Sequence, residues 1–381
     1  MATSNLENLN WRQRLFQILV PLLTCILTVG AIELGLAIFH PIPFSNETNM
    51  YFEPDPYTGY RLKPGGTGTY QMGIPGVANS HGHRDVEVPL KKPPGVFRIL
   101  VLGDSFTVGT NVRQEEAYPK ALERHLKRVY GPKIEVVNAG VGGWDPLQYA
   151  QYYEHYGYRF EPDLILVGFF VGNDTFSPIT SLSKAYTAIR GHLITPEAAA
   201  RRLIKLQVFL YDHSHLARLL MKRGPPGSES FIRKQCDDFS ETYLAIQKTR
   251  MPFHLADSSE QRVNARPAVS QIHRIKNLAG SSLPVVVALL PDENQVNPIL
   301  QARMIDPKEI SKYDFKMPQS MLAQMFREIG LPTIDVLPAV LADPRCLYMN
   351  DTHWTSEGQE LVASVIFDQL TPVIAGMKAS R

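Results

Sequence analysis

Cysteine is scarce in this chain, and the spacing of its few copies argues against two common uses of the residue. Three occur among 381 residues, at Cys25, Cys236 and Cys346. They do not have the close spacing of zinc or redox motifs, and they are too few for a disulfide scaffold. A single bridge between Cys236 and Cys346 is compatible with the sequence, which does not establish it.

The sequence also lacks a charge bias, internal repeats and long low-complexity tracts. Its 39 Lys and Arg residues nearly balance 37 Asp and Glu residues, leaving a formal net charge of +2. Such a balance provides no large field to attract a polyanion, so we expect no nucleic-acid partner. The hydrophobic content of 44% is ordinary for a packed chain with one large domain or two ordinary ones.

An apolar run occupies residues 15–39 and contains one ionisable side chain, Glu33. It is long enough to cross a hydrocarbon core of about 30 Å as a helix, so we predict a transmembrane anchor. Glu33 is then either a helix-end residue near the membrane interface or a buried functional acid. A cleaved signal peptide is the alternative, because residues 29–31 have the small side chains of a cleavage site. The run continues past that site, which favours the uncleaved anchor.

Basic residues on one side of the run predict its orientation. Arg12 and Arg14 precede it, and no matching basic cluster follows closely. The positive-inside tendency therefore places residues 1–14 in the cytoplasm. The rest of the chain, from about residue 41, is predicted to lie outside the cytoplasmic membrane, in a periplasmic or extracellular position.

Short apolar runs alternate with segments of helical spacing from residue 97 onward. The runs read FRILVLGD, IEVVNAG, DLILVGFF, SLPVVVALLP and LPTIDVLP. Strands that alternate with helices indicate an α/β fold with a doubly wound, flavodoxin-like parallel sheet of five strands, over residues 97–375. Residues 41–96, rich in Pro, Gly, Asn and Tyr, are predicted to be an irregular connecting segment.

A helical insertion is expected to interrupt the sheet domain at about residues 176–275. Its apolar residues repeat at helical spacing, and Arg201, Arg202 and Lys205 lie within about one turn. This basic group is either a solvated helix face or a contact with a polysaccharide or a phospholipid head group.

Ser105 lies at the end of the first predicted strand, at the sheet edge where parallel folds bind ligands. A serine nucleophile needs a histidine base, a group that orients the histidine, and hydrogen-bond donors for the developing oxyanion. The later strand ends offer Gly140, Asn173 and the pair Asp351 and His353. These five residues are our candidate site, and the chemistry requires no metal or organic cofactor.

The motifs G-D-S, N-x-G-x-x-G, G-N-D and a C-terminal Asp-His pair resemble those of the SGNH hydrolase superfamily, also called GDSL esterases and lipases, in identity and chain order. The resemblance covers residues 97 to about 372 and implies the SGNH hydrolase fold. It implies Ser105 as the nucleophile, His353 as the base and Asp351 as its partner. The oxyanion donors would be the Ser105 and Gly140 backbone N–H groups and the Asn173 side chain.

The C-terminal motif departs from the usual pattern, in which Asp stands three residues before His. That position is Asn350 here, and Asp351 stands two residues before His353. The sequence DTHW resembles the Asp-x-His-Trp motif of SGNH-like proteins that acetylate bacterial exopolysaccharides, in which the motif precedes the serine. We assign the carboxylate to Asp351, because an asparagine can orient an imidazole but cannot neutralise its charge.

The sequence therefore predicts a membrane-anchored serine esterase that acts through an acyl-serine intermediate. Its expected substrate is an ester, such as the O-acetyl groups of a glycan or a lipid ester. One alternative is an O-acyltransferase that modifies a cell-envelope polysaccharide, because the same residues serve both reactions. A non-catalytic binding protein on the same fold is the other.

Overall fold

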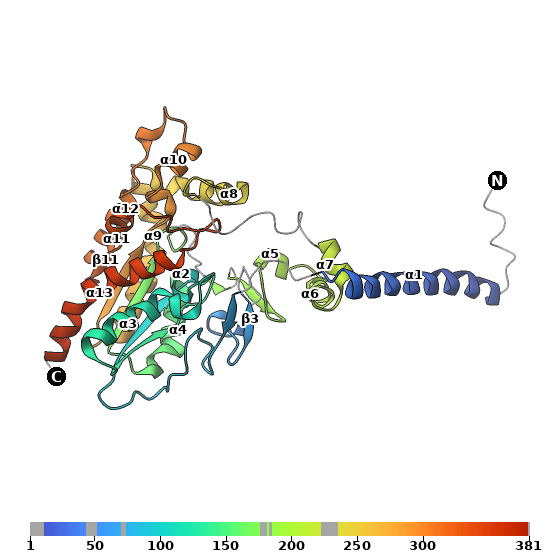
Figure 1. Ribbon diagram of the computed structural model, residues 1–381, viewed down its shortest axis with the longest axis horizontal. Coiled ribbons are helices and arrows are strands. Elements are labelled where there is room, and N and C mark those ends of the chain that lie inside the picture. Colours follow the sequence, from blue (N-terminus) through green and yellow to red (C-terminus); the bar gives the residue numbers. More distant parts are fainter. Residues whose placement is uncertain are drawn as a thin grey trace. The chain divides into compact units, whose positions relative to one another are not determined.

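The computed structural model describes residues 11–42, 52–69, 74–175, 181–182, 185–221 and 235–379. The chain divides into two compact units (Figure 1). One consists of Met1–Ser45 with Arg201–Pro226, and the other of Asn46–Ala200 with Gly227–Arg381. We call them the anchor unit and the catalytic unit, after the transmembrane anchor and the serine esterase that the sequence predicts. Residues 1–10 of the predicted cytoplasmic N-terminus lie outside the described residues.

A five-stranded sheet forms the centre of the catalytic unit. Its strand order is β11-β10-β7-β5-β6, and every neighbouring pair is parallel. In chain order this is 2-1-3-4-5, so the predicted flavodoxin-like, doubly wound sheet is confirmed. All five strands lie within the apolar runs of the sequence: β5 (Phe97–Gly103), β6 (Ile134–Asn138), β7 (Leu164–Phe170), β10 (Val285–Leu290) and β11 (Thr333–Asp335).

Helices cover both faces of the sheet, because successive strand residues point to opposite sides. Leu100 and Leu102 of β5 belong to the core under one set of helices, whereas Ile99 and Val101 belong to the core on the other face. The first set comprises α4 (Pro146–His155), α9 (Ser259–Ala279) and α11 (Met317–Glu328). The second comprises α3 (Tyr118–Tyr130), α12 (Leu337–Ala342) and α13 (Ser356–Ala379).

The predicted connecting segment contains more regular structure than expected. Two antiparallel hairpins lie in it, formed by β1 (Phe52–Asp55) with β2 (Gly59–Leu62) and by β3 (Thr67–Thr69) with β4 (Pro75–Val77). Its side chains pack onto the sheet domain, and the fully buried Arg84 donates hydrogen bonds to the carbonyls of Val108 and Gly109. The Pro and Gly content led us to expect irregular chain, because a three- or four-residue strand shows little periodicity.

The predicted insertion is divided between the two units. Its last helix, α9, covers the sheet as part of the connection from β7 to β10, so it belongs to the doubly wound domain itself. The hairpin of β8 (Thr187–Ile189) and β9 (His192–Ile194), the short α5 (Pro196–Ala199) and α8 (Glu241–Arg250) also belong to the catalytic unit. Residues 176–180, where the insertion was expected to begin, lie outside the described residues.

The anchor unit contains α1 (Trp11–Phe39), α6 (Ile204–His213) and α7 (His215–Met221). The helix α1 has the length and apolar composition of a membrane span, and none of its apolar stretch is buried. Helix α13 is also long and apolar enough to cross a membrane, but its residues Val362, Ile366 and Leu370 lie in the core of the catalytic unit. We therefore identify α13 as a core helix.

Candidate active site

Ser105 is the first residue of a short helix, α2 (Ser105–Val108), that begins directly after β5. Asp104 caps this helix, and its carboxylate accepts the Phe106 N–H at 2.9 Å. A Cβ atom at Gly103 would lie 2.0 Å from Thr107 Oγ1, so a glycine is required where α2 folds back on the strand. The strand stops here because the chain turns at once into α2. This turn leaves Ser105 half-buried at the carboxyl edge of the sheet.

A tight turn brings Asp351 and His353 into contact. His353 Nδ1 lies 3.0 Å from Asp351 Oδ2, and the His353 backbone N–H donates to Asp351 Oδ1 at 3.2 Å. Thr352, between them, has a φ of 78°, a conformation that is unusual for a β-branched residue. The chain therefore turns sharply between the two residues whose side chains are in contact.

The carboxylate of Asp351 is held ionised. Burial would raise the pKa of Asp351. The charge of His353 and the two hydrogen bonds that His353 donates outweigh burial and lower this pKa below its ordinary value. An ionised carboxylate on Nδ1 fixes the imidazole tautomer that leaves Nε2 free to accept a proton. Asn350, the other residue considered from the sequence, accepts a weak hydrogen bond from Ser240 N at 3.4 Å.

Asn111 is a site residue that the sequence did not reveal. Its side chain is buried, and Nδ2 donates a short hydrogen bond to Asp351 Oδ2, the oxygen that faces His353. The backbone of Asn111 has a φ of 64°, which asparagine tolerates better than most residues. Nothing in the sequence signalled this contact, because the two residues are 240 positions apart.

Aromatic rings connect the turn that contains Asp351 and His353, here called the histidine turn, to the helix α2 that begins at Ser105. The Phe106 ring, next to Ser105 in the chain, lies 5.2 Å from the His353 ring and 4.8 Å from the Trp354 ring, measured between centroids. It also stacks on Phe170 at the end of β7, at 3.9 Å. Burial raises the pKa of Asp104, the residue before Ser105, and the electrostatic effect of His353 opposes that rise. Ser105 is thus flanked in the chain by two residues that interact with His353.

Asn173 lies in the turn after β7 and contacts Asp104. Its Nδ2 donates to Asp104 Oδ2 at 3.0 Å, which uses one of the two amide hydrogens and leaves the other for a ligand. The next residue, Asp174, closes this turn by accepting the Phe170 N–H at 3.0 Å and hydrogen bonds from the Tyr149 hydroxyl. Burial raises the pKa of Asp174 well above its ordinary value.

Gly140 does not have the surroundings expected of an oxyanion donor. Its backbone N–H donates to Asn138 Oδ1 at 3.1 Å. A Cβ atom at this position would lie 2.5 Å from Val108 N and 2.8 Å from Thr107 Cβ. Gly140 therefore allows the loop after β6 to pack closely against α2, and the N–H that the sequence predicts as an oxyanion donor is bonded to Asn138.

The later glycines of the same loop have the properties expected of Gly140. A Cβ atom on Gly142 would lie 3.9 Å from Ser105 Cβ, so this residue directly neighbours the serine. Within the described part of the chain, the N–H groups of Gly142, Gly143 and Ser105 have no hydrogen-bond acceptor. The Tyr60 hydroxyl donates to Gly142 O at 2.9 Å and so fixes the loop from the N-terminal hairpin.

His81 and His83, two positions apart in the chain, each contact a neighbouring oxygen. His81 Nε2 lies 2.9 Å from Val88 O, and His83 Nε2 lies 2.5 Å from the Tyr152 hydroxyl. Among the described residues, no group of three or more His, Cys, Asp and Glu side chains is arranged to hold a metal ion.

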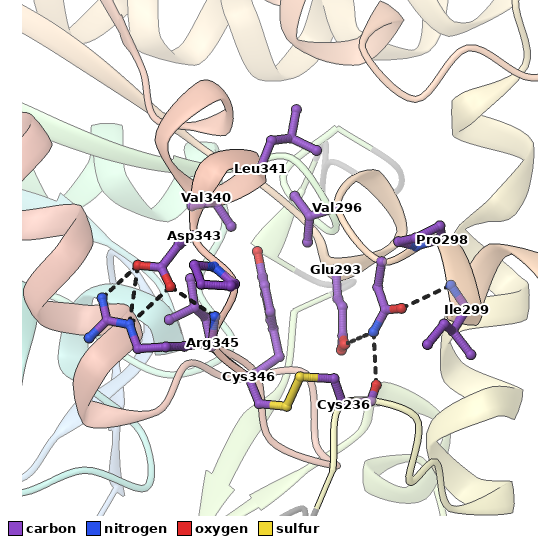
Figure 2. A pocket seen from close by; sticks show the side chains of 14 residues that line it. Cys236, Glu293, Val296, Pro298, Ile299, Val340, Leu341, Asp343, Arg345 and Cys346 are labelled. Atoms are coloured by element: carbon purple, nitrogen blue, oxygen red, sulfur yellow. Dashed lines mark hydrogen bonds and ion pairs between the residues drawn. A yellow bond between two sulfur atoms is a disulfide. The ribbon is translucent and has the colours of Figure 1, made fainter.

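A disulfide joins Cys236 to Cys346 and settles the pairing that the sequence left open. Figure 2 shows this bond at the edge of a pocket that Tyr348 also lines. The Tyr348 hydroxyl donates to Pro291 O at 2.7 Å, and Tyr348 pairs with Trp354 across the histidine turn. The disulfide and this hydrogen bond therefore hold the start of the segment that carries Asp351.

Comparison with solved structures finds matches of low sequence identity and low TM-score. A lipase/acylhydrolase from Enterococcus faecalis is 14% identical, with 72% of this chain and 95% of that chain covered and a TM-score of 0.35. A GDSL-like lipase from Bacteroides thetaiotaomicron is 11% identical, with 72% and 88% covered and a TM-score of 0.34. A catalytic mutant of an acetylxylan esterase from Geobacillus stearothermophilus is 13% identical, with 74% and 96% covered and a TM-score of 0.39. No curated protein matches the chain.

The sequence profile of one family matches most of the chain. It is that of the GDSL-like lipase/acylhydrolases, and the match covers residues 101–361. This range includes Ser105, Asn173 and His353 and all but the first residues of the sheet. The chain belongs to the GDSL-like lipase/acylhydrolase family and is a hydrolase of ester bonds.

Proposed function

We propose that Ser105 is the nucleophile of a serine esterase and that His353 and Asp351 activate it. The observation that carries the proposal is the contact of 3.0 Å between His353 Nδ1 and Asp351 Oδ2, beside the helix that begins at Ser105. Ser105 Oγ attacks the ester carbonyl carbon while its proton passes to His353 Nε2. The same proton then goes to the leaving alcohol, and water hydrolyses the acyl-serine by the reverse sequence.

The oxyanion of the tetrahedral intermediate is proposed to bind to three sets of donors. These are the Ser105 N–H, the Asn173 side-chain amide, and the N–H groups of Gly142 and Gly143. The Ser105 N–H lies at the start of α2, where the first N–H groups of a helix have no partner within the helix. Preorganised donors of this kind are worth about 3–4 kcal/mol each in other acyl-transfer enzymes.

Active-site labelling tests the nucleophile. The full chain in detergent is treated with a fluorophosphonate, and its intact mass is measured. We expect stoichiometric labelling of the wild type and of Asn350→Ala, none of Ser105→Ala, and slow labelling of His353→Ala and Asp351→Ala. Labelling that persists in Ser105→Ala would exclude Ser105 as the nucleophile. A folded wild type that does not label would exclude an activated serine.

We further propose that α1 is an uncleaved membrane anchor and that the catalytic unit acts outside the cytoplasm. The Cys236–Cys346 disulfide supports this, because such bonds persist in oxidising compartments and are rare in the cytosol. Arg12 and Arg14, in the first turn of α1 and before its apolar run, favour the same orientation. The substrate is then an ester of the cell envelope, such as an acylated glycan or a lipid.

Thiol trapping in intact cells tests the location. Cells are quenched with acid, and free thiols are alkylated before and after reduction. We expect Cys25 to react without reduction, because it is the free cysteine of the chain, and Cys236 and Cys346 to react only after reduction. Full alkylation of all three cysteines without reduction would place the domain in a reducing compartment.

A further inference from the structure

The helices α6 and α7 leave the catalytic unit and pack with the apolar helix α1. Residues Arg201–Pro226 form one compact unit with Met1–Ser45, although about 160 positions separate the two segments. Figure 1 shows α6 and α7 beside the C-terminal end of α1. Along α1, Glu33, Gly35 and Leu36 are partly covered, whereas the helix is otherwise exposed. The contact is therefore confined to the last two turns of α1.

Glu33 makes this contact specific. Its carboxylate accepts the Ser214 hydroxyl at 2.8 Å, the His215 N–H at 2.6 Å and the Leu216 N–H at 2.9 Å. A second connection joins the Ile42 N–H to His215 Nδ1 at 2.9 Å. The one ionisable side chain of the apolar run thus binds the start of α7. Three hydrogen bonds compensate a carboxylate for loss of water at the edge of a bilayer.

Large apolar side chains of α6 and α7 remain exposed within this unit. Leu220 is 76% exposed, and Leu206 and Phe209 are 51% and 45% exposed. Four further apolar residues belong to the same surface: Leu203, Leu210, Leu219 and Met221. So many exposed apolar side chains on about twenty residues exceed what an aqueous surface usually carries, and they mark an interaction site. Exposed basic residues accompany them at one end of the segment: Arg201, Arg202 and Lys205.

The position of Glu33 on α1 gives the depth of this surface. The 29 residues of α1 span about 44 Å at 1.5 Å per residue, whereas the hydrocarbon core is about 30 Å thick. A centred helix therefore extends about 7 Å beyond the core at each end. Glu33 lies six residues, or about 9 Å, before Phe39 and so falls at the boundary between hydrocarbon and head groups. Interfacial helices bury their apolar face at this depth.

We propose that Arg201–Met221 is a second membrane element, which lies in the bilayer interface where α1 ends. Leu206, Phe209 and Leu220 contact lipid acyl chains, and Arg201, Arg202 and Lys205 contact phospholipid head groups. The partner is the lipid of the membrane that α1 crosses, so this inference rests on the proposed anchor. The segment extends the attachment from a single span to a span with an interfacial hairpin.

Quenching by membrane lipids tests the proposal in the full chain. The protein is reconstituted into phosphatidylethanolamine and phosphatidylglycerol vesicles that carry nitroxide groups on their acyl chains. An environment-sensitive fluorophore is attached to one thiol at a time. Cys25, exposed near the centre of α1, reports on the anchor, and Leu220→Cys in a Cys25→Ser background reports on α7. Leu341→Cys in the same background is the matched control, because Leu341 is 41% exposed in the catalytic unit.

We expect blue-shifted emission and loss of fluorescence at residues 25 and 220, with an unquenched signal at residue 341. Quenching at residue 25 alone would overturn the interfacial hairpin and leave the anchor intact. Absence of quenching at residue 25 would overturn the anchor and the inference that rests on it. Equal quenching at residues 220 and 341 would also overturn the proposal, because the contact would not be specific to the hairpin.

Discussion

Replacing Asp351 by asparagine removes the charge next to His353 and retains the size of the side chain. In the wild type, Asp351 Oδ2 lies 3.0 Å from His353 Nδ1, and the exposed fractions of the two side chains are 11% and 16%. When His353 takes the serine proton, it becomes an imidazolium, and the carboxylate stabilises that charge. The amide of the variant provides no such charge and also permits the wrong imidazole tautomer.

The magnitude follows from the distance. Two unit charges 3.0 Å apart interact with about 5.5 kcal/mol at an effective dielectric constant of about 20, which suits partly buried pairs. Each 1.36 kcal/mol changes a rate tenfold, so Asp351→Asn is expected to lower kcat/KM by about 10⁴-fold. Asn350→Ala is the control, because the Asn350 side chain accepts a hydrogen bond from Ser240 N and carries no charge. Its expected loss is less than about tenfold.

The assay is hydrolysis of p-nitrophenyl acetate by the full chain in detergent, with Ser105→Ala as the background rate. Asn111→Gly belongs to the same series, because glycine tolerates the φ of 64° and removes the hydrogen bond to Asp351. A hydrogen bond to a charged group contributes about 1.5–3 kcal/mol, so we expect a loss of roughly 10- to 100-fold. The reasoning would be refuted by an Asp351→Asn variant within tenfold of the wild type, or by equal losses in Asp351→Asn and Asn350→Ala.

Three further predictions concern stability and the glycine loop. Gly140→Ala is expected to lower the free energy of unfolding by about 3 kcal/mol, because the added methyl group overpacks against α2. Gly142→Ala should unfold like the wild type but lose activity roughly tenfold or more. Equal unfolding temperatures of the two variants would contradict this prediction. Replacing Cys236 and Cys346 by serine removes a disulfide between residues 110 positions apart and should lower the free energy of unfolding by about 2–5 kcal/mol. Urea unfolding measures this loss, and an unchanged urea midpoint would count against the disulfide. Burial lowers the pKa of His83 from 6.5 to about 3, so the unfolded chain binds a proton that the native chain excludes. Stability should therefore fall by about 2 kcal/mol as the pH drops from 7.5 to 5, and His83→Gln should show a smaller fall; an identical pH dependence would disprove the assignment.

Local sequence determined the sheet and the position of Ser105. Each strand is a short run of β-branched and aliphatic residues bounded by turn residues, so its formation depends on neighbours in the chain. Parallel strands end at one edge, and for this reason the motifs after β5, β6 and β7 were expected to gather there. The apolar run of α1 was equally visible, because its length and composition are local properties.

Tertiary structure alone decided the contacts between distant segments. Asn111 reaches Asp351, and Glu33 reaches His215, across separations that no periodic pattern records. Packing likewise decided that Gly140 lies against α2 and Gly142 beside Ser105, which the sequence of their shared loop does not reveal. Periodicity encodes which face of an element is apolar, whereas the partner of a polar side chain is fixed only when the packed elements bring donor and acceptor within hydrogen-bond distance.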